Sequence, residues 1–364
     1  MATALSRERV ATDRLAASAP DVRVMLIDDS LTVRTVFSRM ISRESDMVIA
    51  ATASTAERGL TELSRTAVDV ILLDLEMPGM GGLEALPQLL KAAPGSKILV
   101  ISSLTAKGAE HTVKALRMGA ADTMLKPQSG GFDDAYREQL LGKIRALKVS
   151  DAETRSARKR PRLSSRTIAK KPQVLAIGAS TGGIHALNLF LRQVPSTFDL
   201  PILITQHLPK SFMPVFAKQM ELASGRKAVL ADENAEIANG TIVIAPGHAH
   251  MMVRRKAGRA VTALASHPVK TGCTPSVDPM FETAAEAYDG YVAGVLLSGM
   301  GRDGTDGAEA IIQAGGSIYA QSADTCAVWG MPRDVTERGL ATAVMEPGDL
   351  ATEILSNVGA DAWR

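Results

Sequence analysis

The stretch VLAIGASTGG, residues 174–183, joins an apolar strand pattern to a glycine-bounded turn that carries Ser180. The residues that follow form an apolar stripe with helical spacing: Ile184, Leu187, Leu191 and Val194. PILITQ, residues 201–206, then has the character of a second buried strand. A strand, a helix and another strand in this order predict a βαβ unit, which belongs to a parallel sheet with helices on both faces.

The same alternation extends in both directions from this unit. Toward the C-terminus, buried-strand patterns occur at residues 241–246, 292–299 and 316–321, and a hairpin pattern surrounds residues 256–258. Toward the N-terminus, four apolar runs alternate with helical stripes: VMLID (24–28), VDVILLD (68–74), KILVISS (97–103) and DTMLKP (122–127). The sequence therefore predicts an α/β protein with two doubly wound parallel-sheet domains, the second of which carries a small antiparallel hairpin.

Composition and charge limit the domain organisation and the partners. The chain has 364 residues, 46% of them hydrophobic, so it can bury two cores and wholesale disorder is excluded. The net charge of +2 argues against a generic nucleic-acid binder. Basic residues concentrate in residues 148–171, which predict a solvated linker, with a nucleic-acid-binding arm as the alternative. We expect an extension at 1–21, a first domain at 22–147, this basic linker, and a second domain at 172–360.

The N-terminal residues, the longest apolar runs and the number of cysteines bear on the compartment in which the protein is expected. The first 20 residues lack the apolar core of a secretory signal, and we interpret them as a disordered extension or an over-long start. No apolar run reaches about 18 residues, so no membrane insertion is expected. Two cysteines, Cys273 and Cys326, cannot form a disulfide framework in a chain of this length. We therefore expect a cytoplasmic protein.

Three carboxylates, a hydroxyl and an ammonium follow the predicted strands of the first domain. They are Asp28, Asp29, Asp74, Ser102 and Lys126. Because the carboxyl ends of parallel strands meet at one sheet edge, these groups are expected to gather there. Clustered carboxylates suit Mg²⁺, and a carboxylate beside the metal can accept a phosphoryl group whose oxygens the other groups stabilise. Alternatively, each Asp is a helix N-cap or a strand-end residue, which explains one of them better than all of them together.

The blocks LIDDS, LLDLEMPGMGG and MLKP resemble those of the receiver domain of two-component response regulators, over roughly residues 22–147. The resemblance implies that Asp74 is the phosphoacceptor and that Ser102 and Lys126 contact the phosphoryl group. It also implies the metal ligands: Asp28, Asp29, Asp74 and the backbone carbonyl of Glu76. Receivers usually carry a switching aromatic residue three positions before the lysine. Thr123 stands there in this chain, which departs from the usual aromatic relay.

The turn around Ser180 has the G-x-S-x-G spacing of a nucleophile elbow. On its own this pattern also fits a dinucleotide-binding turn or a purely structural turn. His207 ends the next strand and Asp303 follows a buried strand, so all three are expected at the same sheet edge. A serine needs a base, and the base needs a carboxylate to orient it, so a Ser–His–Asp triad is predicted. The alternative is that His207 only satisfies a strand end and Asp303 only forms a turn.

Other histidines are weaker candidates for chemistry. His185 lies in the helix after the elbow, where a surface or capping role is expected, and His248 and His250 follow the strand pattern at 241–246. No acidic or cysteine partner stands at ligand spacing to this pair, so no metal is expected at it.

The blocks IGASTGG, ITQHLP, APGHAHM, PSVDPMF, SGMGRDG and GMPR resemble, in order, those of the CheB family of chemotaxis protein-glutamate methylesterases, over residues 174–357. The resemblance implies Ser180 as the nucleophile, His207 as the base and Asp303 as the orienting acid. A triad of this kind acts by forming a covalent acyl-enzyme with its substrate.

Three further positions bear on this site. Backbone N–H groups at Thr181 and in the turn of Met300 are expected to hold the oxyanion. The resemblance implies that Met300 lies close to the site. Many relatives carry Arg before Pro-Ser-Val-Asp, whereas this chain has Thr274. The departure concerns substrate docking rather than the triad.

Together the two resemblances cover nearly the whole chain and imply a receiver of flavodoxin-like fold joined to a Rossmann-like esterase domain. They imply a phosphorylation-activated serine esterase that hydrolyses glutamate methyl esters on methyl-accepting chemotaxis receptors, releases methanol, and deamidates receptor glutamines. A chemotaxis histidine kinase is the implied phosphodonor. Mg²⁺ is needed only for receiver phosphorylation, and the esterase chemistry needs no cofactor. The unphosphorylated receiver is expected to cover the esterase cleft, and the protein is expected to be a monomer.

The rival interpretation is a response regulator without enzymatic activity, whose C-terminal domain binds a signalling partner. A binding module has no need for Ser180, His207 and Asp303 together, which argues against it. A DNA-binding output is weaker still, because no helix-turn-helix pattern is visible and the basic run is confined to residues 148–171. Neither nucleic acid nor a membrane is therefore expected as a partner.

Overall fold

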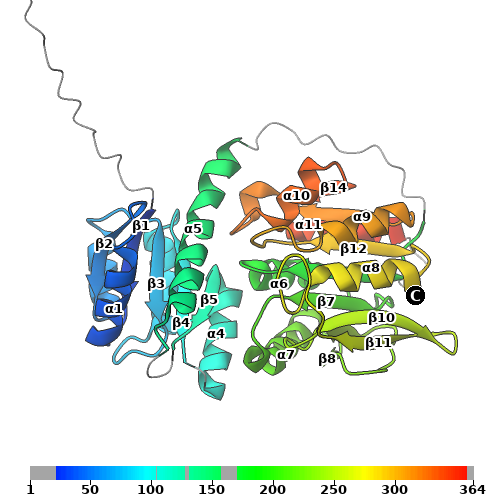
Figure 1. Cartoon of the computed structure of the whole chain (residues 1–364), viewed down its shortest axis with the longest axis horizontal. Coiled ribbons are helices and arrows are strands. Elements are labelled where there is room, and N and C mark those ends of the chain that lie inside the picture. Colours follow the sequence, from blue (N-terminus) through cyan, green and yellow to red (C-terminus); the bar gives the residue numbers. More distant parts are fainter. Residues whose placement is uncertain (1–21, 104, 128–130, 157–169, 359–364) are drawn as a thin grey trace, which may run out of the picture.

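The computed structural model describes residues 22–103, 105–127, 131–156 and 170–358. Two α/β domains stand side by side in it, each built on a parallel sheet (Figure 1). The expected extension at 1–21, residues 157–169 of the expected linker, and residues 359–360 of the expected second domain lie outside the described residues.

The first sheet has the strand order β2-β1-β3-β4-β5, and every neighbouring pair is parallel. Its strands are β1 (Val22–Ile27), β2 (Met47–Ala53), β3 (Val70–Asp74), β4 (Lys97–Ser102) and β5 (Asp122–Leu125). Its helices are α1 (Leu31–Ile41), α2 (Ala56–Leu63), α3 (Gly82–Ala92), α4 (Ala106–Met118) and α5 (Asp134–Ser156). The central strand β3 is buried along its whole length. The strand order reverses between β1 and β3, which is where such sheets hold their ligands.

The second sheet has the strand order β14-β13-β12-β6-β7-β9-β8, again with parallel pairs. Its strands are β6 (Val174–Ala179), β7 (Ile202–Gln206), β8 (Ala228–Leu230), β9 (Ile242–Ile244), β12 (Val292–Leu296), β13 (Ser317–Gln321) and β14 (Ala343–Met345). Its helices are α6 (Gly183–Gln193), η1 (Lys210–Phe212), α7 (Met213–Ser224), α8 (Val277–Ala287), α9 (Thr305–Gln313), η2 (Ala323–Thr325), α10 (Met331–Glu337) and α11 (Pro347–Val358). The antiparallel hairpin is formed by β10 (His250–Lys256) and β11 (Arg259–Ala265), which confirms the expected hairpin.

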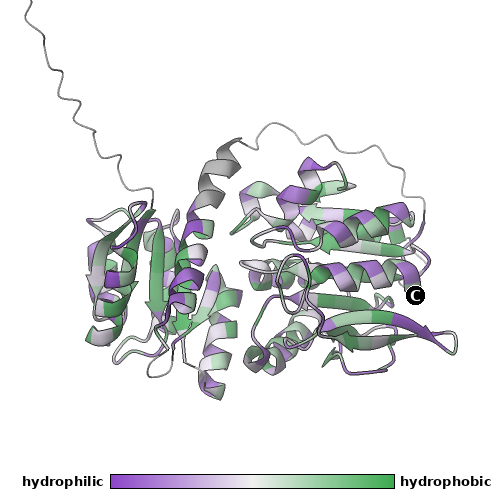
Figure 2. Ribbon diagram, viewed as in Figure 1, coloured by the Kyte–Doolittle hydropathy of each residue, from purple (hydrophilic) through white to green (hydrophobic). Residues whose placement is uncertain are grey.

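Apolar residues concentrate on the strands of both sheets, and polar residues lie on the outer faces of the helices (Figure 2). β6 and β7 are buried at every position, as the continuous apolar runs in the sequence predict. Two parallel-sheet α/β domains with a small hairpin are therefore confirmed. Among the described residues, no helix is both long and apolar enough to cross a bilayer.

Strands at three sheet edges were not expected from the sequence. β2 and β14 are edge strands, and so is β8 at the far side of the second sheet. Most of their side chains are only partly buried, so they form no continuous apolar run. Edge strands bury less of each residue than central strands, and the apolar pattern on which the prediction depends is weak there.

Helix α5 corrects the expected linker boundary. The linker was expected to start at residue 148, but α5 continues to Ser156, so residues 148–156 are helical. No Gly or Pro occurs between Gly142 and Pro161, so nothing in the local sequence ends the helix at residue 148. The basic composition alone is compatible with an exposed helix end as well as with a linker.

The receiver-like domain meets the second domain through α4, α5 and the start of β5. α4 packs against α6, α7 and η1, and α5 contacts η2. Figure 1 shows α4 and β5 on the side of the first domain that faces α6 and α7. The carboxyl edge of β6 and β7, where the serine and histidine lie, is close to this interface.

Candidate active site

Ser180 stands in the turn between β6 and α6. Its N–H donates to the Ser298 carbonyl at 3.0 Å, which ties the turn to the neighbouring chain after β12. Gly182, the N-cap of α6, has φ +78°, and a Cβ there would lie 2.5 Å from the Cβ of Ala327. Both the positive φ and the close approach require glycine at this position. The glycines of the quoted stretch therefore make a tight turn that presents Ser180.

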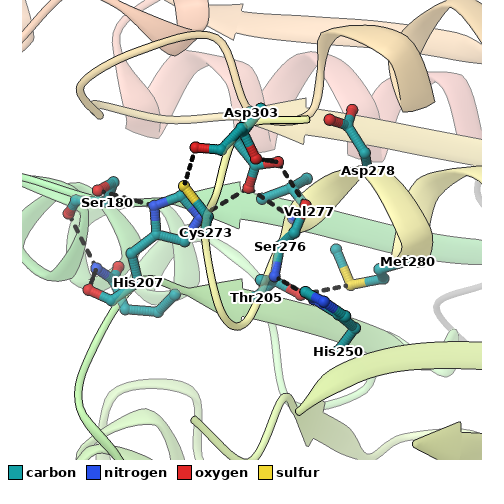
Figure 3. A network of polar contacts seen from close by, with 12 residues as sticks. Ser180, Thr205, His207, His250, Cys273, Ser276, Val277, Asp278, Met280 and Asp303 are labelled. Carbon is teal, nitrogen blue, oxygen red and sulfur yellow. Dashed lines mark hydrogen bonds and ion pairs between the residues drawn. The ribbon is translucent and has the colours of Figure 1, made fainter. Parts of the chain in front are cut away.

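Three neighbouring central strands bring Ser180, His207 and Asp303 together. Ser180 follows β6, His207 follows β7, and Asp303 lies beyond the end of β12. The Ser180 Oγ is 3.1 Å from His207 Nδ1, and His207 Nε2 is 2.7 Å from Asp303 Oδ2 (Figure 3). The histidine faces the serine with one ring nitrogen and the aspartate with the other, which is the relationship a nucleophile, base and orienting acid require.

Asp303 is held by four hydrogen-bond donors. Its Oδ1 accepts from the Ser276 hydroxyl at 2.5 Å and from the Thr271 hydroxyl at 3.2 Å. Its Oδ2 accepts from the Val277 N–H at 2.7 Å as well as from His207. Burial opposes ionisation of Asp303, but the bond from His207 and the other donors outweigh it and lower its pKa to about 2. Asp303 is therefore ionised, and its hydrogen bonds hold the carboxylate in place beside His207.

The same contact acts on the histidine in the opposite sense. Burial by itself lowers the pKa of His207, but its interactions with Asp303 and Cys273 outweigh burial and raise the pKa to about 9. The carboxylate therefore stabilises the imidazolium that forms when His207 accepts a proton.

Several supporting residues were not singled out from the sequence. Ser276, Val277 and Thr271 surround Asp303, and His250 Nδ1 accepts from the Ser276 N–H at 3.0 Å. His250 Nε2 in turn lies 2.8 Å from the His267 carbonyl, so both ring nitrogens of His250 lie within hydrogen-bonding distance of backbone groups. Ser276 and Val277 belong to the block PSVDPMF, and membership of that block is the one sequence signal that could have pointed to them.

The receiver-like domain is hydrogen-bonded directly to the serine turn. The Thr181 hydroxyl donates to Asp122 Oδ2 at 2.6 Å, and the Gly182 N–H donates to the Ala121 carbonyl at 2.6 Å. His185 Nδ1 lies 3.0 Å from the Arg117 carbonyl, so this histidine is at the interface. Thr181 is only 7% exposed. The residues after Ser180 are thus covered in this state of the protein.

The expected oxyanion positions lie around the same turn. Gly299, which precedes Met300, is so close to Ser180 that a Cβ on the glycine would lie 2.9 Å from the Ser180 Cβ. Met300 itself is 47% exposed, next to the site. The N–H of Thr181 donates to no protein group among the described residues. It is therefore free to donate to a ligand.

The first domain gathers its predicted polar residues at the carboxyl edge of β1, β3, β4 and β5. Carboxylate oxygens of Asp28, Asp29 and Asp74 lie within 4.8 Å of one another. Lys126 Nζ donates to Asp74 Oδ2 at 2.6 Å and lies 3.3 Å from Asp28 Oδ2. Ser102 Oγ is buried and has no hydrogen-bond partner in the described part of the chain. The structure therefore brings the three carboxylates and Lys126 together, and Ser102 ends the neighbouring strand β4, where its carbonyl accepts from the Lys126 N–H at 2.7 Å.

The donor set fits a hard divalent cation and a phosphoryl group. Three clustered carboxylates repel one another unless a cation lies among them. Burial raises the pKa of Asp74 to about 6, despite the hydrogen bond from Lys126. The unpartnered Ser102 hydroxyl is available to an incoming oxygen. Glu76 adjoins this cluster, since its N–H donates to Asp74 Oδ1 at 3.0 Å. Thr123 is buried in the middle of β5, with its hydroxyl unpartnered among the described residues.

One cavity of about 640 Å³ connects the two domains near both sites. It is lined by His207, Cys273 and Thr274 on the second domain, and by Asp122 and Lys126 on the first. The loop that follows β5 and carries Lys126 therefore opens on the same space as the candidate base. Thr274, the position at which the sequence departs from the expected arginine, is exposed and lines this cavity.

Fold and site together define a class: a response-regulator receiver domain coupled to a serine-hydrolase type α/β domain. Comparison with known proteins narrows this further. The family model described as CheB methylesterase matches residues 175–354, and the response regulator receiver domain model matches residues 24–131. The chain belongs to the CheB methylesterase family.

Relatives match over almost the full length. A protein-glutamate methylesterase/protein-glutamine glutaminase of Caulobacter vibrioides is 40% identical over 342 residues, which are 92% of this chain and 98% of the relative. One of Paramagnetospirillum magneticum is 36% identical over 377 residues, covering 95% of this chain and 98% of the relative. The crystal structure of the Thermotoga maritima CheB methylesterase catalytic domain is 31% identical, with a TM-score of 0.50, and covers 51% of this chain and 98% of that chain.

Proposed function

We propose that this protein is a phosphorylation-activated serine esterase that hydrolyses glutamate methyl esters on methyl-accepting chemotaxis receptors and releases methanol. The observation that carries the proposal is the hydrogen-bonded line from Ser180 through His207 to Asp303 at three adjacent strand ends. The family and the printed names of the relatives support this substrate class.

The chemistry follows from the direction of the hydrogen bonds. Ser180 Oγ attacks the ester carbonyl while His207 Nδ1 accepts its proton, and Asp303 stabilises the resulting imidazolium at Nε2. The Thr181 N–H and the turn at Met300 supply the donors for the oxyanion. His207 then protonates the departing methoxide, and a water molecule, deprotonated by the same nitrogen, hydrolyses the acyl-enzyme. No cofactor takes part in these steps.

The same acyl-enzyme is reached from a glutamine side chain. His207 then protonates the leaving nitrogen instead of methoxide, ammonia departs, and hydrolysis again gives glutamate. We therefore include deamidation of receptor glutamines in the proposal, which the names of the relatives support.

Control by the receiver is the second part of the proposal. Asp74 is the phosphoacceptor, and Ser102 and Lys126 contact the phosphoryl group. Asp28, Asp29, Asp74 and the Glu76 carbonyl would hold Mg²⁺, which supplies charge neutralisation for phosphoryl transfer. The phosphodonor is a chemotaxis histidine kinase, and the protein acts in the cytoplasm as a monomer, with no nucleic-acid partner.

β5 is the element that links phosphorylation to the esterase. Lys126 follows one end of this four-residue strand, and Asp122 at its other end accepts from Thr181. A phosphoryl group on Asp74 draws the Lys126 ammonium away from its present contact with the carboxylate. The displacement reaches Asp122 along a short rigid strand, and the hydrogen bonds to the serine turn break. This coupling does not need the aromatic residue that Thr123 replaces.

The decisive experiment measures methanol release from methylated receptor membranes, with and without Mg²⁺ and a small phosphodonor. Release that rises with the phosphodonor supports both parts of the proposal. A protein that releases no methanol under either condition, and that a serine-directed acylating probe does not label at Ser180, is a binding module instead.

A further inference from the structure

Cys273 lies against the candidate triad and has no part in the mechanism above. Its Sγ, a ring nitrogen of His207 and a carboxylate oxygen of Asp303 all lie within 4.8 Å of one another. Figure 3 shows the three side chains converging from different segments. Cys273 is half-buried, and its thiol makes a weak contact of 3.8 Å with the Thr271 carbonyl and also interacts with His207. A thiol, an imidazole and a carboxylate therefore meet at one point.

We propose that Cys273, His207 and Asp303 form a binding site for a thiophilic divalent cation, with Zn²⁺ as the best fit. Zinc is bound in proteins by thiolate, imidazole and carboxylate ligands, and three protein ligands leave a fourth position for water. The thiolate and the carboxylate carry two negative charges, which balance the charge of the ion. Hard cations such as Mg²⁺ do not favour a sulfur ligand, so the receiver site and this site select different metals.

The geometry needs only a small adjustment. Metal–ligand bonds of about 2.0–2.3 Å place tetrahedral ligand atoms roughly 3.3–3.8 Å apart. His207 Nε2 and Asp303 Oδ2 are 2.7 Å apart, so they separate slightly while the Cys273 sulfur moves closer. Asp303 is 1% exposed and already anchored by Ser276 and Val277, so one ligand is preorganised.

An ion can reach this point while the receiver covers the serine turn. His207 and Cys273 both line the cavity of about 640 Å³ between the domains. The half-buried thiol therefore faces a space large enough for a hydrated ion. Cys326, the other cysteine, is buried in the second domain beside Gln321 and has no such access.

Binding of the ion releases protons from its ligands Cys273 and His207. The Cys273 thiol loses its proton to solvent as the sulfur–metal bond forms. His207 binds the ion through Nε2 and keeps a proton on Nδ1, so one proton leaves per ion when the ring starts neutral and two leave when it starts as the imidazolium. Nδ1–H then faces the Ser180 hydroxyl and cannot accept its proton. A bound cation therefore stops the esterase by a route independent of the receiver. The inhibition rests on the proposed function, whereas the binding does not.

The test uses untagged full-length protein with Mg²⁺ in large excess, so that the receiver carboxylates are occupied. Zn²⁺ binding is measured by equilibrium dialysis, and Co²⁺ binding by absorption spectroscopy. We expect a thiolate-to-cobalt charge-transfer band in the wild type. Cys273→Ser should lose that band and bind Zn²⁺ more weakly, by on the order of 10–100-fold. The matched control Cys326→Ser should keep the band and the affinity.

A second readout is the rate of methanol release. Zn²⁺ should slow the wild type reversibly, with recovery on chelation, and should slow Cys273→Ser much less. A cobalt complex without the thiolate band, or equal Zn²⁺ affinities of wild type and Cys273→Ser, overturns the proposed metal site. An intact, Cys273-dependent band in a protein that releases no methanol supports the metal site and overturns the esterase function instead.

Discussion

The hydroxyl of Thr181 donates a 2.6 Å hydrogen bond to Asp122, and this bond joins the residue after the candidate nucleophile to the first residue of receiver strand β5. The next N–H along the turn, that of Gly182, donates to the Ala121 carbonyl. Asp122 also accepts from Lys143 at 2.5 Å, which fixes the carboxylate from the receiver side. A two-residue segment of the receiver therefore occupies the hydrogen-bonding positions beside Ser180.

Asp122→Ala should raise methanol release in the absence of a phosphodonor. A hydrogen bond to a charged group contributes about 1.5–3 kcal/mol, so losing it shifts the equilibrium between the covered and the open state by roughly 10–160-fold. The measurement is the initial rate with methylated receptor membranes at equal protein concentration. Glu62→Ala on α2, which packs against β2 and α3, is the matched control and should leave the rate unchanged. A basal rate of Asp122→Ala at or below the wild-type rate would contradict the inhibitory cover.

Ser180→Ala should abolish turnover without unfolding the protein. The side chain lies in a half-buried turn, so its loss leaves no core cavity, whereas loss of a triad member costs on the order of 10⁴- to 10⁶-fold in rate. His207→Ala should be nearly as inactive, and the double variant little worse than either. Losses that multiply in the double variant would show that the two residues do not act as one unit. Circular dichroism checks that each variant is folded.

Asp74→Asn should leave basal methanol release intact and remove its stimulation. The amide nearly matches the carboxylate in size but cannot form an acyl phosphate, and it takes one negative charge from the cation site. Phosphodonor and Mg²⁺ are added to wild type and variant, and initial rates are compared. Full stimulation of Asp74→Asn would place the phosphoacceptor elsewhere.

The esterase should be more active at alkaline than at neutral pH. Because the pKa of His207 is raised to about 9, the base is mostly protonated at neutral pH and cannot accept the Ser180 proton. The kcat/KM of the unphosphorylated enzyme, measured with a chelator present, should therefore rise with pH until about pH 9. Asp303→Asn removes the carboxylate that stabilises the imidazolium, so an NMR titration of His207 should show a lower pKa in that variant. If kcat/KM fell off on the acid side only at or below the ordinary histidine pKa of about 6.5, the proposed effect of Asp303 on His207 would be contradicted.

Central strands made much of the architecture predictable. β1, β3, β6, β7 and β12 are buried on both faces, so they occur in the sequence as continuous apolar runs, and their ends share one edge. The convergence of Ser180, His207 and Asp303 could be expected for that reason, although their catalytic roles stay predictions. The receiver cluster around Asp74 follows from the same rule.

Contacts that depend on domain docking or on the path of a loop could not be predicted. Asp122 is the first residue of the four-residue strand β5, and nothing in its sequence context indicates that it faces Thr181. Cys273 lies in the segment between β11 and α8, and only the folded path of that segment brings it to His207. The edge strands and the length of α5 were missed because partial burial and a polar helix end leave no apolar period.

The long helix α5 determines how far the receiver can travel once it is released. Only residues 157–169 join Ser156 to Lys170, and a chain of that length spans at most about 50 Å. The receiver and esterase domains therefore stay neighbours in every state, at an effective local concentration on the order of millimolar. The fraction of open molecules is then independent of the amount of protein in the cell. A change in expression level scales the total activity and leaves the response to phosphorylation the same.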